Sequence, residues 1–239
     1  MRTAPPAATA GHPAAGRAAA EVLLLFCGTS LFIALAEHLA PRLSVPYLGE
    51  GFYLLAAGCM ILAPAELAFR RGFDLDLFGL GRRGAAGSIA WALVLMAVVF
   101  PLFVAGYHLW ATALWQKTPD FHPPSTGLLL LSFQHIFLVG LPEEFFYRGY
   151  VQRELERVWD RTWFRLLGVP LGPAFFAASL LFSLGHLALL PAGFRLAVFF
   201  PSLMFGWLYK KTGSIAGGML LHGLSNILLF WLKSCYTGA

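Results

Sequence analysis

The chain has 239 residues, of which 58% are hydrophobic and only 12% are charged, and its mean hydropathy is +0.69. Soluble domains carry about 25% charged residues, so this composition excludes an ordinary soluble domain and indicates a membrane protein. The net charge of +5 does not indicate nucleic-acid binding, because membrane proteins collect Lys and Arg in their cytoplasmic loops. We therefore expect the lipid bilayer as a partner, and no nucleic acid.

The apolar pattern predicts an all-α, polytopic transmembrane helix bundle. Residues 1–19 are rich in Ala, Pro and Gly and predict a disordered tail, whereas residues 20–239 predict a single transmembrane domain. A membrane-spanning helix needs about 20 apolar residues. We expect about seven spans, at 20–40, 52–69, 87–110, 126–147, 172–190, 195–210 and 214–233. The first run contains Ala34-Leu35-Ala36, which resembles a signal-peptidase site, so a cleaved signal peptide is the alternative to a retained first span.

The distribution of basic residues predicts the orientation of these spans. With the N-terminus in the cytoplasm, all but four of the 17 Lys and Arg residues lie in cytoplasmic segments, the four being Arg42, Lys117, Arg195 and Lys233. Cytoplasmic loops are enriched in Lys and Arg. We therefore expect a multi-pass protein of the cell (plasma or inner) membrane, with its N-terminus in the cytoplasm.

Residues 151–166 carry an amphipathic pattern. Their arginines recur every four residues and alternate with apolar side chains, at Arg153, Arg157, Arg161 and Arg165. This pattern predicts a short amphipathic helix on the cytoplasmic headgroup surface.

The stretch Leu141–Tyr150, LPEEFFYRGY, places two glutamates and an arginine inside an apolar sequence. Ionisable groups within a membrane are costly, so they are either paired or functional. On a helix, Glu144 and Arg148 are four residues apart and pair along one face. Glu143 is rotated by about 100° from Glu144 and points elsewhere, so it needs a partner from another segment.

Three polar residues on later spans are candidate partners of Glu143. His186 follows Phe182 by four residues, and His222 and Asn226 share one helix face at the same spacing. Each of them alone is typical of a residue that hydrogen-bonds between membrane helices. Together with the glutamates they supply a base, hydrogen-bond donors and an oxyanion site, as water attack on an amide requires.

These residues form three motifs in order, Glu143-Glu144-x-x-x-Arg148, Phe182-x-x-x-His186 and His222-x-x-x-Asn226. They resemble the motifs of the CPBP family of intramembrane proteases (CAAX proteases and bacteriocin-processing proteins), with its Rce-type and ABI-like members. The resemblance covers about residues 126–233, which would form the catalytic portion.

The resemblance implies a glutamate-dependent intramembrane endopeptidase. Glu143 would be the general base, aided by His186, and His222 and Asn226 would bind the oxyanion. Glu144 belongs to the implied catalytic set, and Arg148 is its structural charge partner. The implied substrate is a membrane-anchored protein or peptide, cut near its C-terminus as in CAAX-type or sorting-tag processing.

Alternatives to this function stay open at the level of sequence. Zinc bound by Glu143, His186 and His222 is one, although the absence of HExxH and the placement of the ligands on separate spans favour an enzyme without a cofactor. A non-catalytic scaffold or immunity protein of the same fold is another, and a proton-coupled transporter is a third. The oligomeric state is not defined by the sequence.

The expected spans also create a conflict of depth. Glu143 lies near the cytoplasmic end of the fourth span, whereas His186 lies roughly 21 Å into the fifth. The two meet only if the fourth span is longer than 126–147 or tilted, or if the fifth begins further out.

Overall fold

The computed structural model describes residues 15–39, 42, 47–71, 79, 84–123, 127–189 and 192–237. Residues 1–14 of the expected N-terminal tail lie outside this described part. The last five residues of that expected tail are helical, because α1 already begins at Ala15. The boundary predicted at residue 19 is therefore too late.

The described residues form an all-α bundle in which seven helical stretches occupy the seven predicted ranges. Three helices are long and apolar enough to cross a bilayer by length and composition, namely α1 (Ala15–Leu39), α2 (Leu48–Arg70) and α3 (Ala85–Ala113). Much of their apolar surface is exposed, as at Leu93, Val98 and Leu102 of α3, which suits contact with lipid. The predicted class of a helical membrane protein is confirmed.

The fourth stretch is one uninterrupted helical run from Leu128 to Val158. It consists of α4 (Leu128–Gln134), the π-helical η3 (His135–Gly140), α5 (Leu141–Glu144), the π-helical η4 (Phe145–Gln152) and α6 (Arg153–Val158). Pro142, which cannot donate a backbone hydrogen bond, lies between the two π-helical segments. We call the whole run the long helix, and at 1.5 Å per residue it spans roughly 45 Å.

The long helix resolves the conflict of depth. Its predicted end at residue 147 is wrong, because Arg148 and Gln152 end the apolar run while the helix continues past them. Both side chains are fully buried in the protein, so their polarity does not stop the helix. Glu143 consequently lies near the middle of the long helix and not at its end.

The predicted amphipathic helix over 151–166 is only half correct. α6 ends at Val158, and β2 (Phe164–Leu166) then pairs antiparallel with β3 (Val169–Leu171). The two residues between these strands, Leu167 and Gly168, both have positive φ, the conformation that closes a tight hairpin. Arg161 and Arg165 keep the four-residue spacing of the arginines, but they lie beyond the end of α6 and not on a helix.

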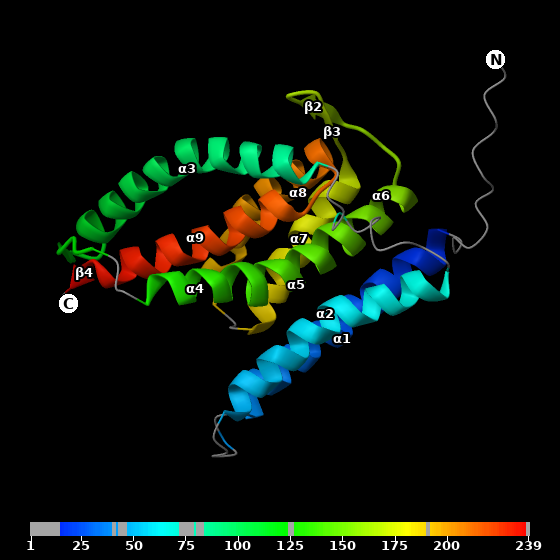
Figure 1. The fold of residues 1–239 in the computed structure, drawn as a ribbon, viewed down its shortest axis with the longest axis horizontal. Coiled ribbons are helices and arrows are strands. Elements are labelled where there is room, and N and C mark those ends of the chain that lie inside the picture. The colour runs from blue at the N-terminus through cyan, green and yellow to red at the C-terminus, as the bar shows by residue number, and fades with distance from the viewer. Residues whose placement is uncertain are drawn as a thin grey trace.

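The remaining helices surround the long helix (Figure 1). These are α7 (Pro173–Leu189), the 3₁₀ segment η5 (Gly193–Val198), α8 (Phe199–Thr212) and α9 (Ala216–Ser234). α1 and α2 lie side by side along one flank of the bundle. A second small ladder pairs β1 (Thr118–Pro119) with β4 (Tyr236–Thr237), which joins the end of α3 to the end of α9.

Close approach of α9 to the long helix depends on glycine. A Cβ atom on Gly218 would lie 2.8 Å from Oε2 of Glu144, and one on Gly223 would lie 2.9 Å from Cα of Ile136. Contacts this short exclude a side chain, so both glycines allow the two helices to touch. This contact places His222, which lies between the two glycines, beside the paired glutamates.

Candidate active site

Glu144 and Arg148 form a fully buried ion pair on the long helix. Arg148 Nε lies 3.3 Å from Glu144 Oε2, and both side chains are completely shielded from solvent. The guanidinium also donates to the Ser202 hydroxyl of α8 at 2.9 Å and lies over the ring of Phe182. The pairing expected from the four-residue spacing is therefore present, and side chains of α7 and α8 hold it in place.

His222 of α9 is held by Glu144 and by an aromatic ring. Its Nδ1 atom lies 3.3 Å from Glu144 Oε1, and its imidazole stacks on Phe205 with ring centroids 5.0 Å apart. A carboxylate can only accept hydrogen bonds, so Nδ1 carries the proton in this contact. The Nε2 atom of His222 is then left to face Glu143.

His186 of α7 is oriented by its own helix. Its Nδ1 atom lies 3.0 Å from the carbonyl oxygen of Phe182, one turn earlier, and its ring packs on the Phe182 ring at 4.5 Å. A carbonyl oxygen is an acceptor, so Nδ1 again carries the proton. As with His222, Nε2 is the atom directed at Glu143.

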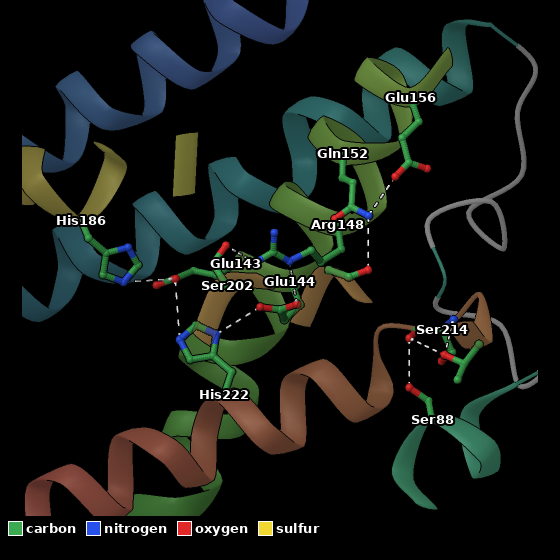
Figure 2. Close-up of polar contacts among 12 residues, drawn as sticks. Ser88, Glu143, Glu144, Arg148, Gln152, Glu156, His186, Ser202, Ser214 and His222 are labelled. Carbon is green, nitrogen blue, oxygen red and sulfur yellow. Dashed lines mark hydrogen bonds and ion pairs between the residues drawn. The ribbon is translucent and has the colours of Figure 1, made fainter. Parts of the chain in front are cut away.

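Glu143 lies between the two histidines, as Figure 2 shows. Its Oε2 atom is 3.8 Å from Nε2 of His186 and 3.9 Å from Nε2 of His222. These distances are too long for direct hydrogen bonds, and Oε2 is buried without a hydrogen-bond partner among the described residues. Three polar atoms from three helices therefore face one small space that is not closed by direct contacts.

Asn226 is the one expected site residue that the structure does not join to the others. It follows His222 by one turn of α9, is half-buried, and makes no hydrogen bond to the rest of the described chain. The site also includes two residues of α8 that no sequence motif indicated, Ser202 and Phe205. A serine inside the apolar run 195–210 was the available signal for the first, whereas nothing distinguished Phe205 from the other apolar residues of that run.

A cavity of about 320 Å³ opens beside Glu143 and His186. α1 and α2 form one wall, and the long helix and α7 form the other. Most of its lining is apolar or aromatic, and besides Glu143 one other carboxylate, that of Glu50, borders it. The mostly apolar lining suits an apolar segment beside Glu143 and His186.

A zinc ion was the alternative expected from the sequence. Two imidazole nitrogens and a carboxylate oxygen are ligands that zinc accepts. In the part of the chain that the structure describes, however, no group of three or more His, Cys, Asp or Glu side chains is arranged to hold a metal ion. We therefore derive no chemical step through a metal ion.

The fold and the site define a helical membrane protein with two glutamates and two histidines at its centre. Residues 124–228 match the family described as Type II CAAX prenyl endopeptidase Rce1-like. This match confirms the resemblance indicated by the three motifs. Searches of curated proteins and of solved structures gave no match.

Proposed function

We propose that the protein is a glutamate-dependent intramembrane endopeptidase in which Glu143 activates the attacking water. The observation that carries this proposal is the position of Glu143 Oε2, 3.8 and 3.9 Å from two Nε2 atoms and without a hydrogen-bond partner among the described residues. We propose that one water molecule lies between these three atoms, which are too far apart for direct hydrogen bonds.

The protons on the histidines decide what each group contributes. Because both Nδ1 atoms carry protons, a neutral His186 and a neutral His222 each present only an acceptor to this water. Water has two protons and cannot donate to three acceptors. A third hydrogen bond therefore requires a proton on one Nε2, and His222 is the better candidate, because the Glu144 carboxylate stabilises its positive charge.

Hydrolysis then proceeds with Glu143 carrying one proton from the water to the departing amine. Glu143 takes a proton from the water while the water oxygen bonds to the peptide carbonyl carbon. The carbonyl oxygen then becomes an oxyanion. The Nε2 proton of His222 stabilises that oxyanion, and we assign Asn226 the second donor role. The C–N bond then breaks, and Glu143 passes its proton to the departing amine.

The surroundings of the site support the proposed class of substrate. The cavity beside Glu143 is mostly apolar and adjoins two helices with exposed leucines. We propose a membrane-anchored protein or peptide as the substrate, with the cut near its C-terminus as in CAAX-type or sorting-tag processing. We further propose a multi-pass protein of the cell membrane with a cytoplasmic N-terminus, on the basis of the Lys and Arg bias.

The test uses purified protein in proteoliposomes with a panel of membrane-anchored peptides in water enriched in heavy oxygen. Cleavage detected by mass spectrometry, with heavy oxygen in the new carboxylate, supports hydrolysis. The Glu143→Gln variant should lose this product. Absence of cleavage by the wild type across the panel, with specific binding of one peptide, would instead favour the scaffold function.

A further inference from the structure

The β2–β3 hairpin ends in a tip that is unusual for a water-exposed turn. The tip consists of Leu166, Leu167 and Gly168. Leu167 has φ +50°, a conformation in which Asn or Gly is normally found and which strains a leucine. The Leu167 side chain is also 65% exposed. In water, both the strain and the exposure would be unfavourable.

The aromatic residues that lead into the hairpin are exposed as well. Trp159, Trp163 and Phe164 each show close to half of their surface. Tryptophan is enriched at the boundary between membrane and water, where its ring lies among the lipid headgroups. The hairpin and the segment before it therefore expose aromatic and aliphatic side chains from the base to the tip.

All three carbonyl groups of the tip accept a hydrogen bond from a side chain. Trp207 Nε1 donates to Leu166 O at 3.1 Å, Lys211 Nζ donates to Leu167 O at 3.0 Å, and an Arg165 nitrogen donates to Gly168 O at 3.2 Å. A turn in water needs no such donors, because solvent supplies them. In an apolar medium, each unpaired backbone group costs several kcal/mol, so donors of this kind are required.

The charge around the hairpin is mainly positive. Arg161, Arg165 and Lys211 are exposed, and Asp160 is the only exposed acidic residue in the segment 159–171. Lys210, nearby on α8, is already paired with Glu156 at 2.8 Å. Each Lys or Arg near a negatively charged leaflet contributes about 1 kcal/mol of attraction. The surface thus complements anionic headgroups better than zwitterionic ones.

We propose that the β2–β3 hairpin is a lipid-inserting element whose tip enters the boundary between headgroups and acyl chains of an anionic leaflet. Insertion buries Leu166 and Leu167, places the tryptophans among the headgroups and brings Arg161 and Arg165 to the phosphates. The side-chain donors from α8 hold the tip in shape while it is removed from water.

The test places a fluorescent probe at the tip. Leu167→Cys is introduced into protein whose Cys27, Cys59 and Cys235 are replaced by Ala, and it is labelled with an environment-sensitive dye. The matched control is Thr162→Cys, an exposed polar position at the base of the same hairpin. Both are reconstituted in nanodiscs of phosphatidylcholine, with or without phosphatidylglycerol. Leu166→Cys provides a second tip probe, should the label at residue 167 disturb the turn.

Insertion predicts that the tip probes shift to the blue and are quenched by iodide several-fold less than the probe at residue 162. Phosphatidylglycerol should increase this protection, and Arg161→Gln, which leaves the donors to the tip in place, should reduce the increase. Equal iodide quenching at the tip and the base in both lipids would overturn the proposal. Protection that does not depend on phosphatidylglycerol would overturn its assignment to anionic lipid.

Discussion

The carboxylate of Glu144 and the imidazole of His222 join two helices, with 3.3 Å between Oε1 and Nδ1. The other oxygen of the same carboxylate binds Arg148, and neither member of that ion pair is exposed to solvent. One buried charge therefore holds the arginine and orients the histidine that faces Glu143.

Replacing Glu144 should test this connection through stability. Glu144→Gln leaves Arg148 buried without its counter-charge, and breaking a buried pair in this way costs about 3–5 kcal/mol. Thermal unfolding in detergent micelles should show a large loss of stability, seen as a lower melting temperature. The matched control is Glu66→Gln, which breaks the exposed pair with Arg70 at the same four-residue spacing and should cost at most about 1 kcal/mol.

A double variant separates this charge effect from general damage. Glu144→Gln combined with Arg148→Met removes both charges and should be less destabilised than the sum of the two single variants. Strict additivity of the single effects would contradict a direct energetic coupling between the two side chains.

Gly218 should be intolerant of even a methyl group. The added Cβ of Gly218→Ala would lie 2.8 Å from Glu144 Oε2, so the carboxylate or α9 must shift. We expect a fall in peptidase activity of about tenfold or more, since small misplacements at a site reduce rates strongly. Gly58→Ala of α2 is the control, because its Cβ would meet no atom within 4 Å, and it should keep its activity. Equal activity of the two variants would argue against a required position for Glu144.

A pH-dependent contact lies outside the site, in the connection after α3 and beside the end of α9. His122 faces two carbonyl oxygens, with Nδ1 3.1 Å from Pro123 O and Nε2 3.2 Å from Ser234 O. Both contacts are hydrogen bonds only when the ring carries two protons. These bonds to Pro123 and Ser234 raise the pKa of His122 above its ordinary value.

The sign of the pH effect follows from this raised pKa. The stabilisation is fully present below the unfolded pKa of about 6.5 and is lost as the pH rises through the higher folded value. Melting temperatures measured across this range should fall for the wild type. His122→Gln should flatten that part of the profile, and a profile unchanged by the substitution would refute the role of His122.

Removal of metal tests the proposed activation of water. We expect peptidase activity to be unchanged by prolonged dialysis against a chelator and not to increase when zinc is added. Loss of activity on dialysis, restored by zinc, would replace direct activation by Glu143 with metal chemistry at Glu143, His186 and His222.

Local spacing predicted the parts of the site that lie on one helix. The interval of four residues was enough to pair Glu144 with Arg148 and to leave Glu143 for partners elsewhere. The ordered motifs identified His186 and His222 as those partners. The supports from α8, Ser202 and Phe205, were not predictable, because their roles depend on how α8 packs against the long helix.

Hydropathy failed where polar side chains are buried by protein. Arg148 and Gln152 ended the predicted fourth span, although both lie inside a continuous helix. The period of arginines likewise predicted a helix across residues 159–166, where the left-handed Leu167 and Gly168 instead close a hairpin. In both cases tertiary packing or backbone conformation decided the outcome, and neither is visible in an apolar pattern.

The measurement that tests the central claim most directly is the single-turnover cleavage rate of Glu143→Gln in proteoliposomes, compared with Glu50→Gln. Both variants remove a carboxylate that borders the same cavity, and only Glu143 faces the two histidines. Loss of a general base lowers rates by about 10²–10⁴-fold, so Glu143→Gln should fall in that range while Glu50→Gln stays within a few-fold of the wild type. Cleavage by Glu143→Gln at the wild-type rate would contradict the assignment of Glu143 as the catalytic base.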